Sequence, residues 1–578
     1  MRVTRRSTFI LVLLVLLAGL GGGVNAQDGV KWTPVTDDRL LNAEKDPGNW
    51  LTYYRSLDGW RYSPLDQVRT RNVKRLAPRW IFSLGETGDQ ESHPVVNDGV
   101  MIVTSSNIPH VTVYALDAKT GKVLWKWTRK MPDDLTAFAR IHPHNRGVAL
   151  YGDKVYVGTL DSKLVALDAR TGKELWVSPV GDYKDGYFVN AVPFVAKGTV
   201  ITYPSGPGEM GIRGFAEAFD AETGKSLWKT YFVPGPGEKG FDTWEGDSWE
   251  RGGGPVWLTP TYDKETDTVY FGTGNPSPFI DVVRKGDNLF TSTLVAVDRA
   301  TGKYKWYYQY LPNDAWDFDT MNEHTVVKIK RDGEEIPALI SAQKTGYLYA
   351  FDKNEGKLLY ATPITNHIDI FNGVDLATGR IKENPGKRPK MGGEQLLLCP
   401  SLFGGRNWGP SAYSPRTGLV YIPTNDTCMK YGYVKEIKWT RGLAYVGITW
   451  SLVVPGDNAG ALRAFDVNTG RKVWEVPNKA PLSLSGVLAT AGDLVFFQRP
   501  EGQFTALDAK TGAVLSEFNL GMPASAAPIT YTVDGKQYIA VVVGGKTRAR
   551  GWFAPEPKLA HMNNVNFGGM LVVFGLPD

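Results

Sequence analysis

Short apolar segments that end at an aspartate recur along the chain, and each is followed by a tight turn and a second apolar segment. The clearest copies are ALDAKTGKVLW from Ala115, ALDARTGKELW from Ala166, AFDAETGKSLW from Ala218 and AVDRATGKYKW from Ala296. A strand that leads through a Thr-Gly turn into a second strand is the pattern of a β-hairpin. No long apolar period of the kind that an amphipathic helix shows competes with it.

Weaker copies of the same motif begin at Ala350, Ala412, Ala464 and Ala506. In the first three clear copies the aspartates, Asp117, Asp168 and Asp220, are 51 and 52 residues apart. Internal repeats of this length indicate propeller blades or a solenoid. The segment RLAPRWIF around Trp80 looks like an incomplete first unit, and GGMLVVFGL near the C-terminus can supply its missing strand. We therefore predict an all-β fold, a single eight-bladed β-propeller domain over residues 27–578, whose two ends meet in one sheet.

A tryptophan closes all four of the clearest copies and the weaker copy from Ala464, at Trp125, Trp176, Trp228, Trp306 and Trp474. One large flat side chain at the same place in each unit can pack between neighbouring blades, where it buries about 150–250 Å². We expect these tryptophans to dock the blades onto one another.

The first residues have the pattern of a secretory signal. Three arginines precede an apolar run from Phe9 to Leu20, and Val24-Asn25-Ala26 is typical of a cleavage site. The run is too short to span a bilayer, so we predict a signal peptide at residues 1–26, a periplasmic protein and no membrane span. Removing it lowers the formal net charge from +5 to about +2, which with no basic run gives no indication of a nucleic-acid partner.

Cysteine is rare, because Cys399 and Cys428 are the only two in the sequence. In an exported protein such a pair is expected to form one disulfide. The sequence has no Cys-x-x-Cys-His motif, so no c-type haem is attached to this chain.

The segment PNDAWDFDTMNE, residues 312–323, concentrates four carboxylates. Asp317 and Asp319 are two residues apart, so in an extended segment both side chains point to one face. The residues alone leave two interpretations open: a solvated acidic loop, or a site for a hard cation with a base beside it.

The repeat, the segment GTGNP at residues 272–276 and the segment WDFD at residues 316–319 together resemble the pyrroloquinoline quinone (PQQ)-dependent alcohol dehydrogenases of the methanol/ethanol type. The resemblance extends over essentially all of the chain after the signal segment. It implies an exported enzyme that oxidises a primary or larger alcohol to an aldehyde by hydride transfer to metal-activated PQQ. With no haem domain, a soluble c-type cytochrome is the implied electron acceptor. The alternatives are a non-enzymatic propeller scaffold, or a family member that acts on an aldehyde, a polyol or a polymeric alcohol.

The resemblance also implies roles for single residues. Asp317 matches the catalytic base, the metal ligands would be Glu209, Asn275, Asp317 and Asp319, and the cofactor contacts would be Glu91, Arg146, Asn190, Trp257, Lys344 and Asn407. PQQ carries carboxylates and carbonyls, which need cationic donors, and a flat ring, which needs an aromatic floor. The two cysteines match a pair that the family joins as a disulfide.

An acid at the position of Asp319 resembles the lanthanide-using members of the family. A trivalent ion of calcium-like size gains more from one additional anionic oxygen than calcium does. We therefore expect one lanthanide ion, with Ca²⁺ as the alternative.

The chain departs from the family pattern in three places. Asn190 takes the place of a hydroxyl residue that contacts the cofactor, a change that still offers hydrogen bonding. Arg140 and Ile141 stand where many relatives carry an adjacent Cys-Cys pair beside the cofactor, and His142 or His144 is expected near this face. Leu484 stands where methanol oxidisers have a tryptophan, which favours alcohols larger than methanol. The sequence leaves the oligomeric state open, with a homodimer as one option.

Overall fold

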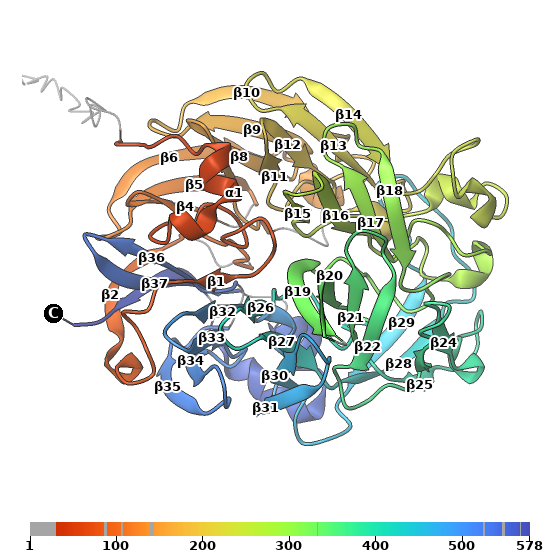
Figure 1. The fold of residues 1–578 in the computed structure, drawn as a ribbon. Helices are drawn as coiled ribbons and strands as arrows, with labels where there is room; N and C mark the ends of the chain where they lie inside the picture. The colour runs from red at the N-terminus through yellow and green to blue at the C-terminus, as the bar shows by residue number, and fades with distance from the viewer. Residues whose placement is uncertain are drawn as a thin grey trace, which may run out of the picture.

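The computed structural model describes residues 30–577, apart from residues 86–88, 106–107, 139–143, 332, 524–525, 546–548 and 567. Antiparallel sheets surround a common centre (Figure 1), which is the arrangement of a β-propeller. The predicted signal segment, residues 1–26, lies outside the described residues. Among the helices that are described, none combines the length and the apolar character needed to cross a membrane.

Within the described residues, eight sheets have four or five strands each. Five of them use strands that are consecutive in the sequence: β3 (Val95–Asn97), β4 (Val100–Thr104), β5 (His110–Asp117) and β6 (Val123–Lys130); β7 (Ala149–Tyr151), β8 (Lys154–Thr159), β9 (Lys163–Asp168) and β10 (Glu174–Pro179); β11 (Phe194–Ala196), β12 (Thr199–Thr202), β13 (Phe215–Asp220) and β14 (Ser226–Tyr231); β15 (Thr261–Asp263), β16 (Thr268–Gly272), β17 (Thr293–Asp298) and β18 (Tyr304–Gln309); β19 (Thr325–Arg331), β20 (Glu334–Ala342), β21 (Tyr347–Asp352) and β22 (Leu358–Pro363).

The other three sheets combine more distant segments. They contain β26 (Ala412–Ser414), β27 (Leu419–Asn425), β30 (Gly460–Asp466) and β31 (Lys472–Asn478); β1 (Tyr62–Ser63), β32 (Val487–Thr490), β33 (Leu494–Gln498), β34 (Gln503–Asp508) and β35 (Val514–Asn519); and β2 (Ala77–Ser83), β36 (Ile529–Val533), β37 (Lys536–Gly544) and β38 (Gly569–Gly575).

Two smaller sheets and short helical segments complete the described chain. The small sheets pair β23 (Phe371–Val374) with β24 (Ile381–Glu383), and join β25 (Leu396–Leu398), β28 (Cys428–Tyr433) and β29 (Ile448–Val453). The α-helices are α1 (Asp37–Leu41), α2 (Leu135–Phe138) and α3 (Pro207–Met210). Turns of 3₁₀-helix occupy Ala43–Lys45, Val73–Arg75, Phe241–Thr243, Ser248–Arg251, Asp281–Val283, Pro385–Lys387, Leu482–Leu484 and Pro557–Asn564, and a π-helical turn occupies Ala549–Phe553.

The repeated turn explains why the motif carries an aspartate and a glycine. Between β9 and β10, Asp168 Oδ1 accepts hydrogen bonds from the backbone N–H of Thr171 at 2.9 Å and from its hydroxyl at 2.8 Å. Gly172 then has a φ of 71°, which favours glycine, and a Cβ there would lie 2.5 Å from the ring of Trp125. Trp125 Nε1 donates to Ala169 O at 2.9 Å. The turn of one sheet therefore covers the tryptophan of the preceding sheet.

The same glycine-to-ring contact recurs around the molecule. It pairs Gly121 with Trp80, Gly224 with Trp176, Gly302 with Trp228, Gly356 with Trp306, Gly470 with Tyr360 and Gly512 with Trp474. An aromatic ring from one sheet thus contacts the turn of the next at each of these places.

Strands from the two ends of the described chain share one sheet, as the sequence pattern predicts. Ala77 of β2 lies opposite Gly575 of β38, and Ser83 lies opposite Met570. In Figure 1 the orange β2 belongs to the same sheet as the blue β36 and β37, with β38 next to it.

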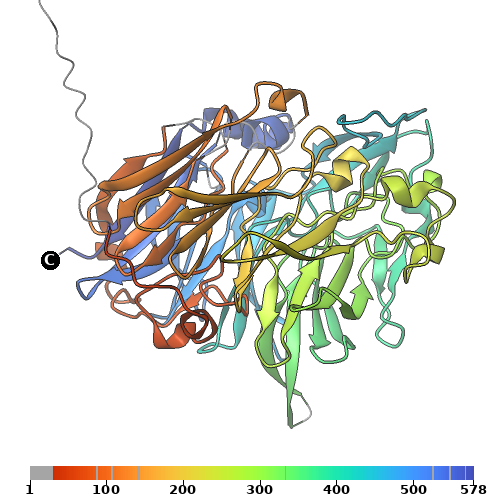
Figure 2. The ribbon, with the colours of Figure 1, turned by 90° about the horizontal axis from the view of Figure 1, so that it is seen from above.

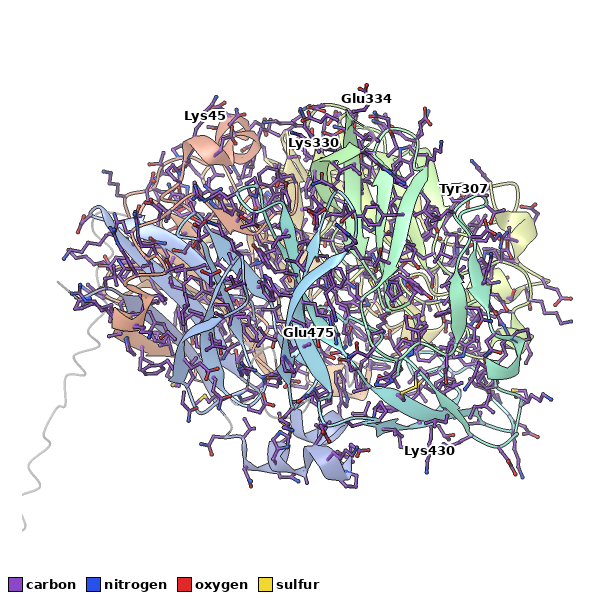
Figure 3. All side chains as sticks on the ribbon, turned by 60° about the horizontal axis from the view of Figure 1, so that its bottom comes forward. Lys45, Tyr307, Lys330, Glu334, Lys430 and Glu475 are labelled. Carbon is purple, nitrogen blue, oxygen red and sulfur yellow. A yellow bond between two sulfur atoms is a disulfide. The ribbon has the colours of Figure 1, made fainter. Side chains whose placement is uncertain are left out.

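The two edges of the ring differ. Figure 2 shows α2 (orange) and the violet helical segments near residues 549–564 at one edge, whereas the green β19–β20 hairpin projects from the opposite edge. The predicted disulfide is confirmed: Cys399 and Cys428 are joined by an S–S bond of 2.05 Å, drawn in yellow in Figure 3. It ties the end of β25 to the start of β28.

Candidate active site

A cavity of about 280 Å³ brings together side chains from segments that are far apart in the sequence. Its polar lining consists of Arg146, Asn190, Ser205, Glu209, Asp317, Asp319, Lys344 and Asn407. Its apolar lining consists of Trp257, Phe279, Leu402, Phe403, Trp408, Val446, Ile448, Trp450 and Trp552. Of the site residues predicted from the sequence, Glu91 and Asn275 are not in the lining, but both contact residues that are.

Asp317 lies in the loop between β18 and β19, in a backbone conformation that is uncommon for a residue other than glycine. Its φ is 65°. Asp314 stabilises this loop: its two carboxylate oxygens accept hydrogen bonds from the backbone N–H of Trp316 at 2.9 Å and of Phe318 at 2.7 Å. The residues on both sides of Asp317 are therefore fixed by one buried carboxylate, and such over-determined strain is typical of functional sites.

Lys344 connects the two neighbouring aspartates. Its Nζ donates to Asp319 Oδ2 at 2.7 Å and to the backbone oxygen of Asp317 at 2.8 Å, and lies 3.5 Å from Asp317 Oδ2. Burial raises the pKa of Asp317 well above its usual range; Lys344 opposes the rise, whereas the carboxylates of Asp319 and Glu209 add to it. Burial lowers the pKa of Lys344, but Asp317 and Asp319 outweigh it and leave that pKa above its usual value.

Three separate segments approach one another beside these aspartates. Asp319 Oδ1 accepts a hydrogen bond from the backbone N–H of Asn275 at 3.0 Å. A Cβ at Gly274 would lie 2.5 Å from Asp319 Oδ1, and a Cβ at Gly208, next to Glu209 in α3, would lie 2.5 Å from Asn275 Oδ1. The glycines of GTGNP and SGPGEMG are therefore required for the predicted metal ligands to come close.

The oxygens at this end of the cavity fit a hard cation. Asn275 Oδ1 and Asp317 Oδ1 are buried, and neither accepts a hydrogen bond from the described residues. Buried oxygens of this kind normally have a partner, and carboxylate and amide oxygens are ligands for calcium-like ions. Among the described residues, no three side chains of His, Cys, Asp or Glu form a metal site by themselves. The donor set fits a cation only if Asn275 and an added ligand, such as the cofactor, complete the shell.

A second polar network is centred on Arg146, which is 2% exposed. One terminal nitrogen of Arg146 lies 2.9 Å from Glu91 Oε2, and the other donates to Asn190 Oδ1 at 3.2 Å and to the backbone oxygen of Trp257 at 3.1 Å. Its guanidinium lies 5.0 Å from the ring centre of Trp257 and 5.6 Å from that of Trp408. A buried cation between two indoles is suited to a flat anionic ligand.

His144 contacts two other members of this network, Glu91 and Asn190. It is fully buried, and its Nε2 lies 3.1 Å from Glu91 Oε2 and 3.2 Å from Asn190 Nδ2. It is not among the residues that line the cavity. The positions of Arg140, Ile141 and His142, where the family pattern is broken, lie outside the described residues.

The sequence analysis missed the apolar wall of the cavity. The ring of Phe403 lies 5.7 Å from that of Trp450 in β29 and 5.2 Å from that of Trp552 in the π-helical turn. Both tryptophans lie outside the repeats, so they are not needed to dock blades. Their position was the one feature of the sequence that could have indicated a role in the cavity wall. Leu484 is 4% exposed and packs in the apolar cluster around this wall, but it is not in the lining.

Comparisons with known proteins agree with this fold. The family model for the PQQ-dependent glucose/ethanol/alcohol dehydrogenase β-propeller domain matches residues 50–366 and 478–539. The chain is 37% identical to quinoprotein alcohol dehydrogenase PedH of Pseudomonas putida over 601 residues, which cover 100% of this chain and 98% of that protein. It is 36% identical to the lanthanide-dependent methanol dehydrogenase of Methylacidiphilum fumariolicum, over 89% of this chain and 87% of the other.

A solved structure gives the same result. The europium-containing methanol dehydrogenase matches with a TM-score of 0.88 at 34% identity, over 93% of this chain and 100% of the other. A cavity that combines oxygen donors for a hard cation with an indole-flanked arginine fits a cofactor-dependent oxidoreductase. The chain belongs to the PQQ-dependent quinoprotein alcohol dehydrogenases, enzymes that oxidise alcohols with PQQ and a metal ion.

Proposed function

We propose that this protein is an exported alcohol dehydrogenase that oxidises primary alcohols larger than methanol to aldehydes and passes the electrons to a soluble c-type cytochrome. One observation carries the proposal: two buried oxygens that accept no hydrogen bond from the described residues, Asn275 Oδ1 and Asp317 Oδ1, lie at or beside the cavity that Lys344 and Arg146 line. Export rests on the signal pattern in residues 1–26 and the acceptor on the family resemblance.

The cofactor would be held by the two cationic ends of the cavity. Arg146 and Lys344 would bind its carboxylate and carbonyl oxygens, Asn190 and Asn407 would add hydrogen bonds, and Trp257 would support the ring. Glu91 is placed to orient Arg146, with which it forms a buried ion pair at 2.9 Å. When bound, PQQ supplies the hydride acceptor, and the metal ion polarises the carbonyl that receives the electrons.

The metal ion would be held by Glu209, Asn275, Asp317 and Asp319. Three of these residues are carboxylates, and a trivalent ion of calcium-like size gains more from the additional anionic oxygen of Asp319 than calcium does. We therefore propose a lanthanide as the preferred metal, with Ca²⁺ as the alternative.

Asp317 would act as the base that accepts the proton of the alcohol hydroxyl. Its Oδ1 accepts no hydrogen bond from the described residues. Burial raises the pKa of Asp317, and the charge of Lys344 opposes that rise. Phe403, Trp450 and Trp552 would contact the alkyl part of the alcohol and exclude water. An aldehyde in its hydrated form, a polyol or a polymeric alcohol is a second candidate substrate, because each presents a carbon that carries both a hydrogen and a hydroxyl group.

Two structural proposals accompany the function. The eight large sheets would be eight blades of one domain over residues 27–578, an assignment supported by the ring contacts between successive sheets. A homodimer is the second proposal, and sedimentation of the purified protein tests it.

The direct test is reconstitution of the purified apoprotein with PQQ and either La³⁺ or Ca²⁺. Dye reduction would be followed with primary alcohols of increasing length, and with the matching aldehydes. We expect activity with ethanol and longer alcohols, and higher activity with La³⁺. Absence of dye reduction in every combination would refute the proposed function.

A further inference from the structure

Arg284 lies between the two loops that carry Asn275 and Asp317, although it is absent from the cavity lining. The side chain is 1% exposed. Its Nε donates to the backbone oxygen of Pro278 at 2.6 Å, and one of its terminal nitrogens donates to the backbone oxygen of Asp314. Pro278 follows Asn275 by three residues, and Asp314 precedes Asp317 by three. One guanidinium therefore joins the two loops at equivalent distances along the chain.

Asp314 carries this restraint to Asp317. The same residue whose backbone oxygen accepts from Arg284 uses its carboxylate to hold the N–H groups of Trp316 and Phe318. These two residues flank Asp317. A shift of the Arg284 side chain would thus be transmitted to Asp317 through Asp314 and its hydrogen bonds to the two flanking residues.

A second connection acts in parallel through Asn288. The remaining terminal nitrogen of Arg284 donates to Asn288 Oδ1 at 2.8 Å, and Asn288 Nδ2 donates back to the backbone oxygen of Arg284 at 2.9 Å. Asn313 Nδ2, next to Asp314, donates to the same Asn288 oxygen at 3.0 Å. The loop around residues 281–288 and the start of the Asp317 loop are therefore fixed to one another.

The chemistry of these contacts points to geometry as the purpose of Arg284. Burying a guanidinium is costly, and the hydrogen bonds described here go to two backbone oxygens and an amide oxygen. A rigid planar fork can hold two oxygens at a set separation, whereas the single ammonium of lysine cannot. Partners that orient ligands in this way typically change metal affinity by about 10–100-fold when they are removed.

We propose that Arg284 is a positioning residue that sets the separation between Asn275 and Asp317, and with it the affinity of the site for its metal ion. The proposal rests on the proposed function, because it takes these two residues as metal ligands. It predicts that a positive charge at position 284 is not sufficient for full metal affinity. The planar guanidinium, which can donate to two oxygens at a fixed separation, is required.

The test compares Arg284→Met and Arg284→Lys with a matched pair, Arg299→Met and Arg299→Lys. Arg299 is also largely buried and donates to Asp267 and Thr199, in a repeat turn remote from the cavity. Each protein, reconstituted with PQQ, is titrated with Eu³⁺, and the luminescence lifetime and the half-saturating concentration are recorded. We expect both Arg284 variants to raise the half-saturating concentration at least about tenfold and to shorten the lifetime, as water enters the coordination shell. Both Arg299 variants should bind Eu³⁺ as the parent does.

Two outcomes would overturn a proposal, and a further variant covers the case in which Arg284 variants do not fold. Unchanged Eu³⁺ affinity and lifetime in the Arg284 variants, with a lowered melting temperature, would show that Arg284 is merely structural and would overturn the inference. If both Arg284 variants fail to fold, Asn288→Ala, which removes one partner of the fork, provides the same comparison with the same expected direction. A parent protein that binds no Eu³⁺ would instead overturn the proposed metal site itself.

Discussion

The ammonium of Lys344 donates to Asp319 Oδ2 at a distance of 2.7 Å, so the carboxylate that distinguishes this site is also tied to a cation of the chain. The other oxygen of Asp319 accepts from the backbone N–H of Asn275 at 3.0 Å. Asp319 is therefore held in place beside the proposed metal site, and Lys344 balances part of its charge. Although Lys344 offsets part of the negative charge of Asp319, the electrostatic attraction between that carboxylate and a metal ion is larger for an ion of high charge.

Replacing Asp319 by alanine should weaken lanthanide binding more than calcium binding. The lost anionic oxygen interacts more strongly with a trivalent than with a divalent ion, so we expect the half-saturating La³⁺ concentration to rise at least about tenfold. Titration of the PQQ-reconstituted variant with La³⁺ and with Ca²⁺ measures this. Glu335→Ala, which removes an exposed carboxylate paired with Lys328, is the control. An equal shift for the two ions would contradict the assignment of lanthanide preference to Asp319.

Replacing Asp317 by asparagine should abolish most of the turnover while leaving PQQ bound. Asparagine has nearly the same shape but cannot accept the hydroxyl proton, and general-base catalysis contributes about 10²–10⁴-fold. Dye reduction gives kcat, and the absorbance of the bound quinone shows that the cofactor is retained. A kcat within a factor of ten of the parent would exclude Asp317 as the base.

Replacing Trp552 by alanine should flatten the preference for longer alcohols. The indole packs on Phe403 in the apolar wall, and each buried methylene of a substrate gains about 0.8 kcal/mol. We expect kcat/KM for hexanol to fall several-fold more than that for ethanol, measured over the series of primary alcohols. Leu484→Ala, in the same apolar cluster but outside the lining, should lower all of them alike. A uniform decrease in the Trp552 variant would show that the wall does not select for length.

The double variant Cys399→Ser, Cys428→Ser should be less stable than the parent by about 2–4 kcal/mol in free energy of unfolding. The disulfide closes a loop between residues that are 29 apart, so its loss increases the freedom of the unfolded chain. Urea denaturation with and without reductant measures the effect. The parent in reductant should match the variant, and the variant itself should not respond to reductant. Equal stability of parent and variant without reductant would contradict the prediction.

His324 should make the protein less stable in acid. Burial lowers the pKa of His324 from 6.5 to about 3, so between these values the unfolded chain binds a proton that the folded chain does not. Stability therefore falls as the pH decreases through this window, by up to about 1.4 kcal/mol per pH unit from this group. Gln in its place removes the titration, although it disturbs the contact with the Tyr310 hydroxyl at 2.9 Å. Urea denaturation at pH 7 and pH 5 gives the free energy of unfolding of the parent and of His324→Gln. The difference between the two proteins should be smaller at pH 5, and an equal loss of stability in both would contradict the prediction.

The sequence predicted the propeller fold because its defining interactions are local and repeated. Asp168 and Thr171 build their turn within four residues, and the same letters recur in every strong copy. The disulfide was predictable because two cysteines can form only one pair. Most of the proposed site residues line one cavity, although their individual roles remain predictions.

The parts that sequence could not supply depend on contacts between distant segments outside the repeats. Trp450 comes from the strand after the disulfide and Trp552 from a helical turn near the C-terminus, and no shared motif connects them. Arg284 gave no signal either, because it binds backbone oxygens, and these are the same for any residue type. A charged side chain in a loop is ordinarily exposed, so its burial appears only when the loops are packed together.

The pairing of β2 with β38 has a consequence for how a cell makes this protein. β2 is synthesised early, and it lacks its neighbour until almost the whole chain has followed. A strand with a free hydrogen-bonding edge invites association with other chains, and the entropy cost of joining such distant segments slows its capture. Chaperones that shield this strand until β38 has been synthesised should therefore raise the yield of native enzyme.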